Sequence, residues 1–227
     1  MQLFKDCCSC YFDFTKESKC NSVHPECMIQ NINLDKLLSI CDTGDIILFS
    51  SETIVGNIIK KFTNSKYTHV GIIIKNKDSV FIYDSNFKNP NESGVTISPL
   101  KQTLISFKGE IFYRKLKLVD NFNKDAMNTK LSLIHNTLKN KFYDWIPNNW
   151  VAAYLSTNGK DEISRIISDG RHLDRMFCSS FVAYIYTQLG FLEPNTEWSF
   201  IAPCEFGKMA ILYDGSILEK EISINIF

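Results

Sequence analysis

A cysteine stands at the front of a strongly apolar helical pattern late in the chain. The stretch FCSSFVAYIYTQLG runs from Phe177 to Gly190 and predicts a helix that ends at the glycine. The first turn of a helix carries a partial positive charge and free backbone N–H groups, which favour a thiolate and can hold an oxyanion. Ser179 and Ser180 are small and leave room for a substrate. Cys178 is therefore a candidate nucleophile, although a cysteine in an apolar helix is more often a packing residue.

A histidine and an acidic residue lie on two consecutive predicted strands. His69 interrupts the apolar run YTHVGIIIK (67–75), and Asp84 interrupts VFIYDSN (80–86). A buried carboxylate needs a partner, and antiparallel pairing across the short turn KNKD (75–78) places Asp84 beside His69. A carboxylate on one imidazole nitrogen fixes the tautomer and leaves the other nitrogen to take a proton. Nucleophile, base and orienting group together are the layout of a thiol enzyme.

Other residues compete for these roles. His172 in DGRHLDR lies close in sequence to the candidate nucleophile and is the rival base, and Asp45 is the rival orienting group. The expected pairing of the strands favours Asp84 over Asp45 in that role. We expect His135 at the surface or boundary of a helix and Cys204 as a bystander in a loop, and His24 has no comparable context.

The segments around these residues predict alternating strands and helices. Strands are expected over 45–49, 67–75, 80–86, 95–98 and 109–118, and helices over 120–140 and 177–189. Ser51 is expected to cap a helical segment, ETIVGNIIKKFT, whose apolar residues fit either a core or a lipid groove. This order predicts an α+β fold, an antiparallel sheet or half-barrel packed against helices.

Length and charge narrow the class of protein. The 227 residues fit one large domain or a domain with an appendage. With 25 basic and 25 acidic residues, the balanced charge argues against a nucleic-acid partner. The sequence has no apolar run of transmembrane length and no secretory signal pattern. We therefore expect a cytoplasmic protein, or a virion-associated one if the source is a virus, and peripheral contact with a membrane stays open.

Eight cysteines fall into two groups. Five crowd the first thirty residues, and Cys41, Cys178 and Cys204 are scattered. A reducing compartment would keep most of them as free thiols. The N-terminal group lacks the two paired arms of a zinc site, and no basic or apolar segment beside it supports S-acylation as an anchor. No metal and no organic cofactor is predicted.

Several motifs in order resemble a known family. These are GDIILF, SKYTHVGIII, VFIYDSN, VTISPL, FYD, FCSSFVAYIYTQLG and APCEF, between about residues 42 and 207. Together they resemble the circularly permuted papain-like fold of the NlpC-type superfamily, in which the histidine precedes the cysteine. The YiiX-like hydrolases and their relatives in poxviruses and other large DNA viruses look most similar, and lecithin:retinol acyltransferase-like proteins are more distant.

The resemblance implies roles for matching positions. Cys178 matches the nucleophile and His69 the general base, while Asp84 stands where YiiX-like proteins most often have a longer glutamate. The positions that would line or support the site are Tyr67, Tyr143, Asp144, Ser179 and Pro203, and Gly44 with Asp45 would open a strand in a structural role. Residues 1–32 would be a cysteine-rich extension and 33–227 the catalytic domain, with a lid at 148–174.

The resulting expectation is a thiol hydrolase, an amidase or peptidase that works through a Cys-His-Asp triad and an acyl-enzyme. One alternative is a lipid acyltransferase or phospholipase with the same triad. Another is a non-catalytic binding module or a virion structural protein that keeps the fold. The expected partners are accordingly a peptide, amide or lipid ester substrate and no nucleic acid.

Overall fold

The computed structural model describes residues 31–77, 79–86, 93–144 and 175–226. The predictions for the cysteine-rich N-terminal group, the lid at 148–174, His24 and His172 lie outside these described residues.

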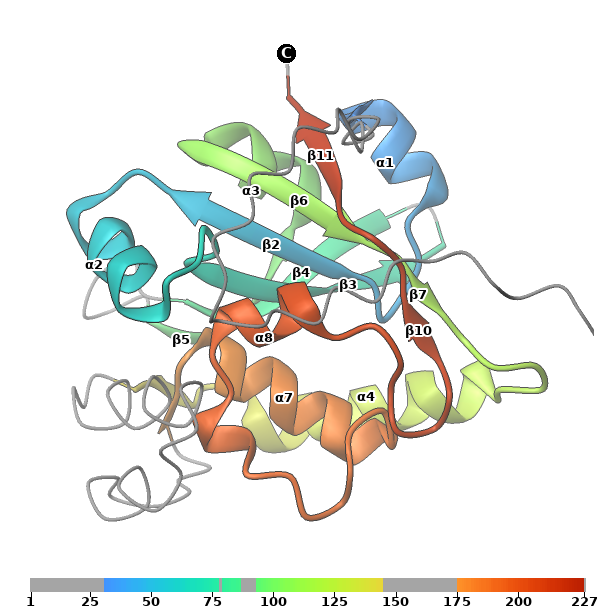
Figure 1. The fold of residues 1–227 in the computed structure, drawn as a ribbon. Helices are drawn as coiled ribbons and strands as arrows, with labels where there is room; N and C mark the ends of the chain where they lie inside the picture. The colour runs from blue at the N-terminus through green and yellow to red at the C-terminus, as the bar shows by residue number, and fades with distance from the viewer. Residues whose placement is uncertain (1–30, 78, 87–92, 145–174, 227) are drawn as a thin grey trace, which may run out of the picture.

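The described chain is built on one seven-stranded sheet, with strand order β1-β11-β6-β2-β3-β4-β5 (Figure 1). These strands are β1 (Asn31–Asn33), β2 (Ile46–Ser51), β3 (His69–Asn76), β4 (Ser79–Asn86), β5 (Gly94–Pro99), β6 (Gly109–Arg114) and β11 (Ile222–Asn225). All neighbours are antiparallel except β1 and β11, which run parallel. The α+β class is thus confirmed, and the prediction of a purely antiparallel sheet is wrong at this edge.

Helices cover both faces of the sheet (Figure 1). They are α1 (Leu34–Ile40), α2 (Ile54–Thr63), α3 (Leu100–Ser106), α4 (Lys124–Leu138), α7 (Cys178–Leu189), the 3-10 turn η1 (Trp198–Phe200) and α8 (Pro203–Lys208). Two short ribbons complete the fold, an antiparallel one of β7 (Leu116–Lys117) with β10 (Ile217–Leu218) and a parallel one of β8 (Phe142–Tyr143) with β9 (Arg175–Met176).

The sheet separates two apolar cores. One core contains Val70 and Ile72 together with residues of α4 and α7. The other contains Ile73 and Ile82 with residues of α1 and α3. Side chains alternate across a strand, so the nearly continuous apolar run of β3 supplies both cores, as expected for a strand buried on both faces.

Helix α7 begins at Cys178 and ends where the sequence predicts. Gly190 adopts a left-handed conformation with φ 88°, and its N–H donates to the carbonyls of Thr187 and Tyr186. A residue with a side chain would be strained at this φ, which explains the glycine. Phe181 and Ile185 are fully buried, so the apolar stripe of this helix is core.

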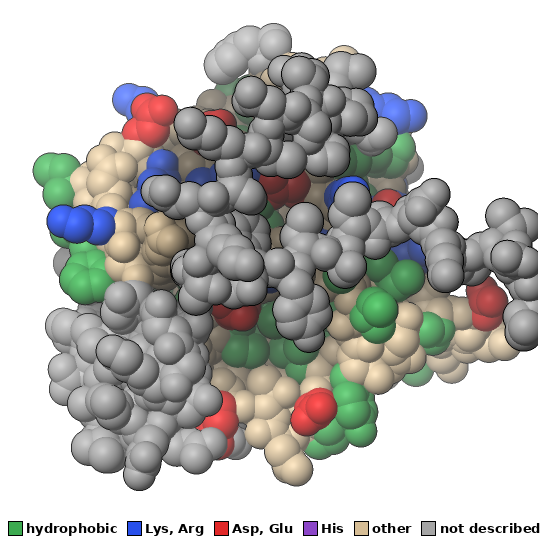
Figure 2. Space-filling view, viewed as in Figure 1, with side chains coloured by type: hydrophobic (Ala, Val, Ile, Leu, Met, Phe, Trp, Pro, Cys, Tyr) green, Lys and Arg blue, Asp and Glu red, His purple; other side chains and the backbone are tan. Residues whose placement is uncertain are grey.

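Helix α2 differs from its prediction. Its N-cap is Thr53, whose side chain accepts a hydrogen bond from the N–H of Gly56, and not Ser51. Most of its apolar side chains are exposed, and Gly56 is its buried residue. Figure 2 shows hydrophobic side chains on the surface at the end of the molecule where Figure 1 places α2.

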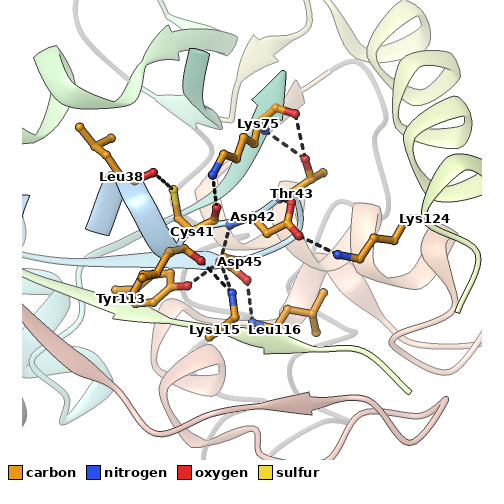
Figure 3. A network of polar contacts seen from close by, with 12 residues as sticks. Leu38, Cys41, Asp42, Thr43, Asp45, Lys75, Tyr113, Lys115, Leu116 and Lys124 are labelled. Carbon is orange, nitrogen blue, oxygen red and sulfur yellow. Dashed lines mark hydrogen bonds and ion pairs between the residues drawn. The ribbon is translucent and has the colours of Figure 1, made fainter. Parts of the chain in front are cut away.

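A buried aspartate ties the start of β2 to β6 and β7 (Figure 3). Asp45 is fully buried and accepts hydrogen bonds from the Tyr113 hydroxyl (2.6 Å), the Leu116 N–H (2.8 Å) and the Asp42 N–H (2.8 Å). Next to it, the carbonyl of Gly44 accepts a bond of 2.7 Å from the Tyr186 hydroxyl of α7. Burial raises the pKa of Asp45, and the three donors counter that rise. The network therefore fixes α7 relative to the sheet.

We expect Asp45→Asn to destabilise the protein by about 2–4 kcal/mol, because an amide cannot accept all three bonds and leaves buried donors unsatisfied. Urea unfolding measures this loss. Asp120→Asn, which changes an exposed carboxylate, serves as the control and should stay within about 0.5 kcal/mol of the parent. Equal stability of the two variants would contradict the structural role of Asp45.

Candidate active site

His69 and Asp84 are joined directly. The His69 Nε2 lies 2.8 Å from the Asp84 Oδ2, and Asp84 is buried. The other carboxylate oxygen, Oδ1, accepts a bond of 3.2 Å from the Thr96 hydroxyl on β5. Both oxygens are therefore held, which fixes the carboxylate and through it the imidazole ring.

The pairing of β3 with β4 differs from the predicted one by two residues. Ile72 pairs with Tyr83, and continuing this register sets Asp84 level with Gly71 instead of His69. An offset of two residues keeps both side chains on the same face, so His69 reaches Asp84 diagonally.

Gly71 leaves the space for this diagonal contact. A Cβ at Gly71 would lie 2.7 Å from the Ile82 Cδ1 and 3.3 Å from the Asp84 Cβ. Ile82 is fully buried, so a side chain at Gly71 would force a shift in the packed core. A glycine at this position of the HVGI motif, two residues after the histidine, therefore avoids a collision with the neighbouring strand.

Cys178 occupies the first position of α7 and is buried. The residues before it are held in place by β8 and by β4, since the carbonyl of Met176 accepts bonds from the Ser85 hydroxyl (2.5 Å) and the Asp144 N–H (3.3 Å). The N-cap residue, Phe177, makes no side-chain cap to the helix. In the described part of the chain no capping side chain occupies the backbone N–H groups of the first turn, which can therefore donate to another acceptor, such as an oxyanion.

Cys178 and Asp84 both lie close enough to His69 to influence the charge of its ring. Burial by itself lowers the pKa of His69, but the negative charge of Cys178, the hydrogen bond to Asp84 and a hydrogen bond to Cys178 outweigh it and raise that pKa to about 10. Because Nε2 faces Asp84, Nδ1 is the nitrogen left for the thiol. A protonated His69 between a carboxylate and a cysteine has both of the neighbours that a histidine needs to act on a thiol.

Tyr143 lies close to the charged groups of the site. Burial raises its pKa well above the usual value, and the charges of Cys178, Asp144 and Asp84 add to the rise. The Tyr143 hydroxyl therefore stays protonated and can act as a hydrogen-bond donor. Asp144 is buried next to it on the chain.

The other predicted supporting residues have packing contacts. Tyr67 packs edge-on against Phe112, and its ring fills the space that a Cβ of Gly207 on α8 would need. Pro203 is buried at the start of that helix. Ser179 is fully buried, and its hydroxyl has no hydrogen-bond partner among the described residues.

The structure separates the rivals from the site. Asp45 binds Tyr113 and Leu116 and not His69. The His135 Nδ1 lies 3.3 Å from the Tyr83 hydroxyl at the boundary of α4. Cys204 is buried in α8, not in a loop as predicted.

Two contacts of the site were not predicted from the sequence. Thr96 holds Asp84, and the Phe49 ring lies against the His69 ring with centroids 5.4 Å apart. Counting residues along two paired strands would have found Thr96, because it stands opposite Asp84 in the β4–β5 register. Phe49 lies on β2, opposite His69 of β3, but nothing in the sequence around Phe49 distinguishes it from other core residues.

No protein-family model matches the chain, and no curated protein matches it. Among solved structures it is similar to the metalloprotein yiiX from Escherichia coli O157:H7, with a TM-score of 0.47 and 15% sequence identity over 82% of this chain and 97% of that one. Within the described residues there is no group of three or more side chains suited to hold a metal ion. None of the helices in the described part of the chain has the length and apolar character needed to span a membrane.

Proposed function

We propose that this protein is a thiol hydrolase with the permuted papain-like, NlpC-type arrangement. One observation carries the proposal. His69 hydrogen-bonds the Asp84 carboxylate, and Cys178, the first residue of a helix, lies close enough to help raise the pKa of the same histidine. A packing cysteine needs neither a histidine partner nor a carboxylate behind it.

The reaction begins with attack of the Cys178 thiolate on the carbonyl carbon of an amide or ester. A C–S bond forms, and the carbonyl oxygen takes the electron pair and becomes an oxyanion. The Cys178 backbone N–H and the Tyr143 hydroxyl are the donors that we assign to this oxyanion. When the oxyanion collapses, the bond to the leaving amine or alcohol breaks and His69 gives that group its proton.

Water completes the cycle. His69, now neutral, takes a proton from water as the oxygen attacks the thioester, and the thiolate leaves with the electrons of the C–S bond. The acid product departs and the ion pair is restored. Asp84 keeps the His69 ring oriented through both half-reactions and stabilises its positive form. In a lipid acyltransferase an amine or alcohol would replace this water, so the acyl-enzyme is common to both functions.

A trapped intermediate tests the proposal. We expect a panel of activated amides, peptides and phospholipids to include a substrate that leaves an acyl group on Cys178, seen by mass spectrometry of the intact protein and its peptides. Release of this acyl group to water alone indicates a hydrolase, whereas its transfer to an added amine indicates an acyltransferase. An adduct distributed evenly over Cys41, Cys178 and Cys204 would support the non-catalytic alternative instead.

A further inference from the structure

Helix α2 turns its apolar face outward. Ile54, Val55 and Ile58 are 82%, 54% and 50% exposed, and they lie on adjacent positions of the helix surface. The contact with the sheet is made through Gly56, where a Cβ would come within 2.8 Å of the Ser51 carbonyl oxygen. An amphipathic helix of a globular protein normally buries its apolar stripe. In α2, the glycine allows the helix to lie close to the sheet, and the apolar stripe stays exposed.

The charges of α2 are one-sided. Its sequence, IVGNIIKKFT, has Lys60 and Lys61 in the last turn and no acidic residue. The whole chain has equal numbers of basic and acidic residues, so this positive charge is local. Neither lysine forms an ion pair with a described acidic residue.

This combination favours a lipid surface over a protein partner. Lysine is depleted in protein–protein interfaces, whereas exposed aliphatic residues beside lysines are typical of helices that lie in the interface of an anionic membrane. The aliphatic side chains enter the boundary between headgroups and acyl chains. The lysines extend their stems along it and place their charges among the phosphates.

The position of α2 connects this surface with the candidate site. The helix joins the end of β2 to the start of β3, where His69 is the first residue. The segment between them is anchored, because the Thr68 N–H donates to the Phe49 carbonyl at 2.7 Å and the Thr68 hydroxyl accepts from the Ser51 N–H at 2.9 Å. In Figures 1 and 2 the helix and its exposed hydrophobic and basic side chains lie at this end of the sheet.

We propose that α2 docks the protein onto an anionic membrane surface and brings the His69 end of the sheet close to that surface. The docking depends on Ile54, Val55, Ile58, Lys60 and Lys61. It does not depend on the reactivity of Cys178, although it would direct a thiol hydrolase toward acyl groups of lipids or of membrane-bound proteins.

Vesicle flotation of the full chain tests the proposal. We expect the protein to float with phosphatidylcholine vesicles that contain about one quarter phosphatidylserine, and to bind less at high salt. The double variant Ile54→Glu/Ile58→Glu should bind at least roughly tenfold more weakly to these vesicles. Lys60→Gln/Lys61→Gln should remove most of the preference for phosphatidylserine over pure phosphatidylcholine. The matched control is Leu133→Glu, an equally apolar residue of α4 that is 64% exposed and should leave binding unchanged.

Three kinds of result would overturn the docking surface. The first concerns binding: either the parent protein floats with neither vesicle, or the glutamate double variant binds like the parent. The second is a large loss of thermal stability in that double variant, which would mean that the face is packed within the chain. The third is a dimer in light scattering that the same substitutions dissociate, which would assign the face to a second copy. Cys178→Ala should float like the parent, so a failure of the hydrolase proposal leaves this test intact.

Discussion

Cys178→Ala is expected to lose at least about a thousandfold in kcat/KM on any substrate that acylates the protein, while its thermal stability stays close to that of the parent. In the proposed mechanism the thiol is the attacking group, so no other side chain replaces it. The substitution removes a single sulfur atom at the start of α7 and keeps the core residues of that helix in place. Steady-state hydrolysis and a thermal melt of the same preparations measure both quantities.

The matched controls are Cys41→Ala and Cys204→Ala. Both thiols are buried, and burial raises the pKa of each to about 11, so they are present as unreactive thiols at neutral pH. We expect both control variants to keep full activity. Iodoacetamide should accordingly modify Cys178 before the other two, and His69→Ala should slow that modification. Full turnover by Cys178→Ala or His69→Ala would refute the thiol mechanism.

The sequence points to the three candidate residues because each of them breaks a local pattern. His69 and Asp84 are polar residues in apolar β runs, and Cys178 is the residue at which a helical pattern begins. The sequence does not predict the offset between the two strands, because a turn of a few residues allows more than one register. Even so, the alternation of side chains preserved the contact, since a shift of two residues returns a side chain to the same face.

Helix α2 and strand β1 show where the sequence falls short. Periodicity reveals that α2 has an apolar face but not whether that face meets the core, which depends on where Gly56 sits against Ser51. Strand β1 has only three residues, NIN, and no pattern of its own. Its place in the sheet comes from pairing with β11, almost two hundred residues away in the chain.

Removing the negative charge at Asp84 should change both the rate and its pH dependence. In the parent, the carboxylate is one of the groups that raise the pKa of His69 above its usual 6.5. With Asp84→Asn that pKa falls, so the alkaline limb of kcat/KM should move to lower pH by roughly one to two units. The rate at the optimum should fall by about 10²–10⁴-fold, because the amide no longer stabilises the imidazolium or sets its tautomer. A pH–rate profile from pH 5 to 10 measures both.

Stability gives an independent readout of the same charge. A histidine with a raised pKa in the folded state contributes stability that is complete below pH 6.5 and is lost as pH rises toward about 10. Asp84→Asn should therefore flatten the fall in unfolding free energy across that window. Thr96→Val removes only a neutral donor to the Asp84 Oδ1 and leaves the charge, so it should keep the parent's alkaline limb with a modest loss of rate. If both variants kept the parent's pH profile, the charge on His69 would not depend on Asp84, and the carboxylate would be a packing partner of the ring instead of its electrostatic support.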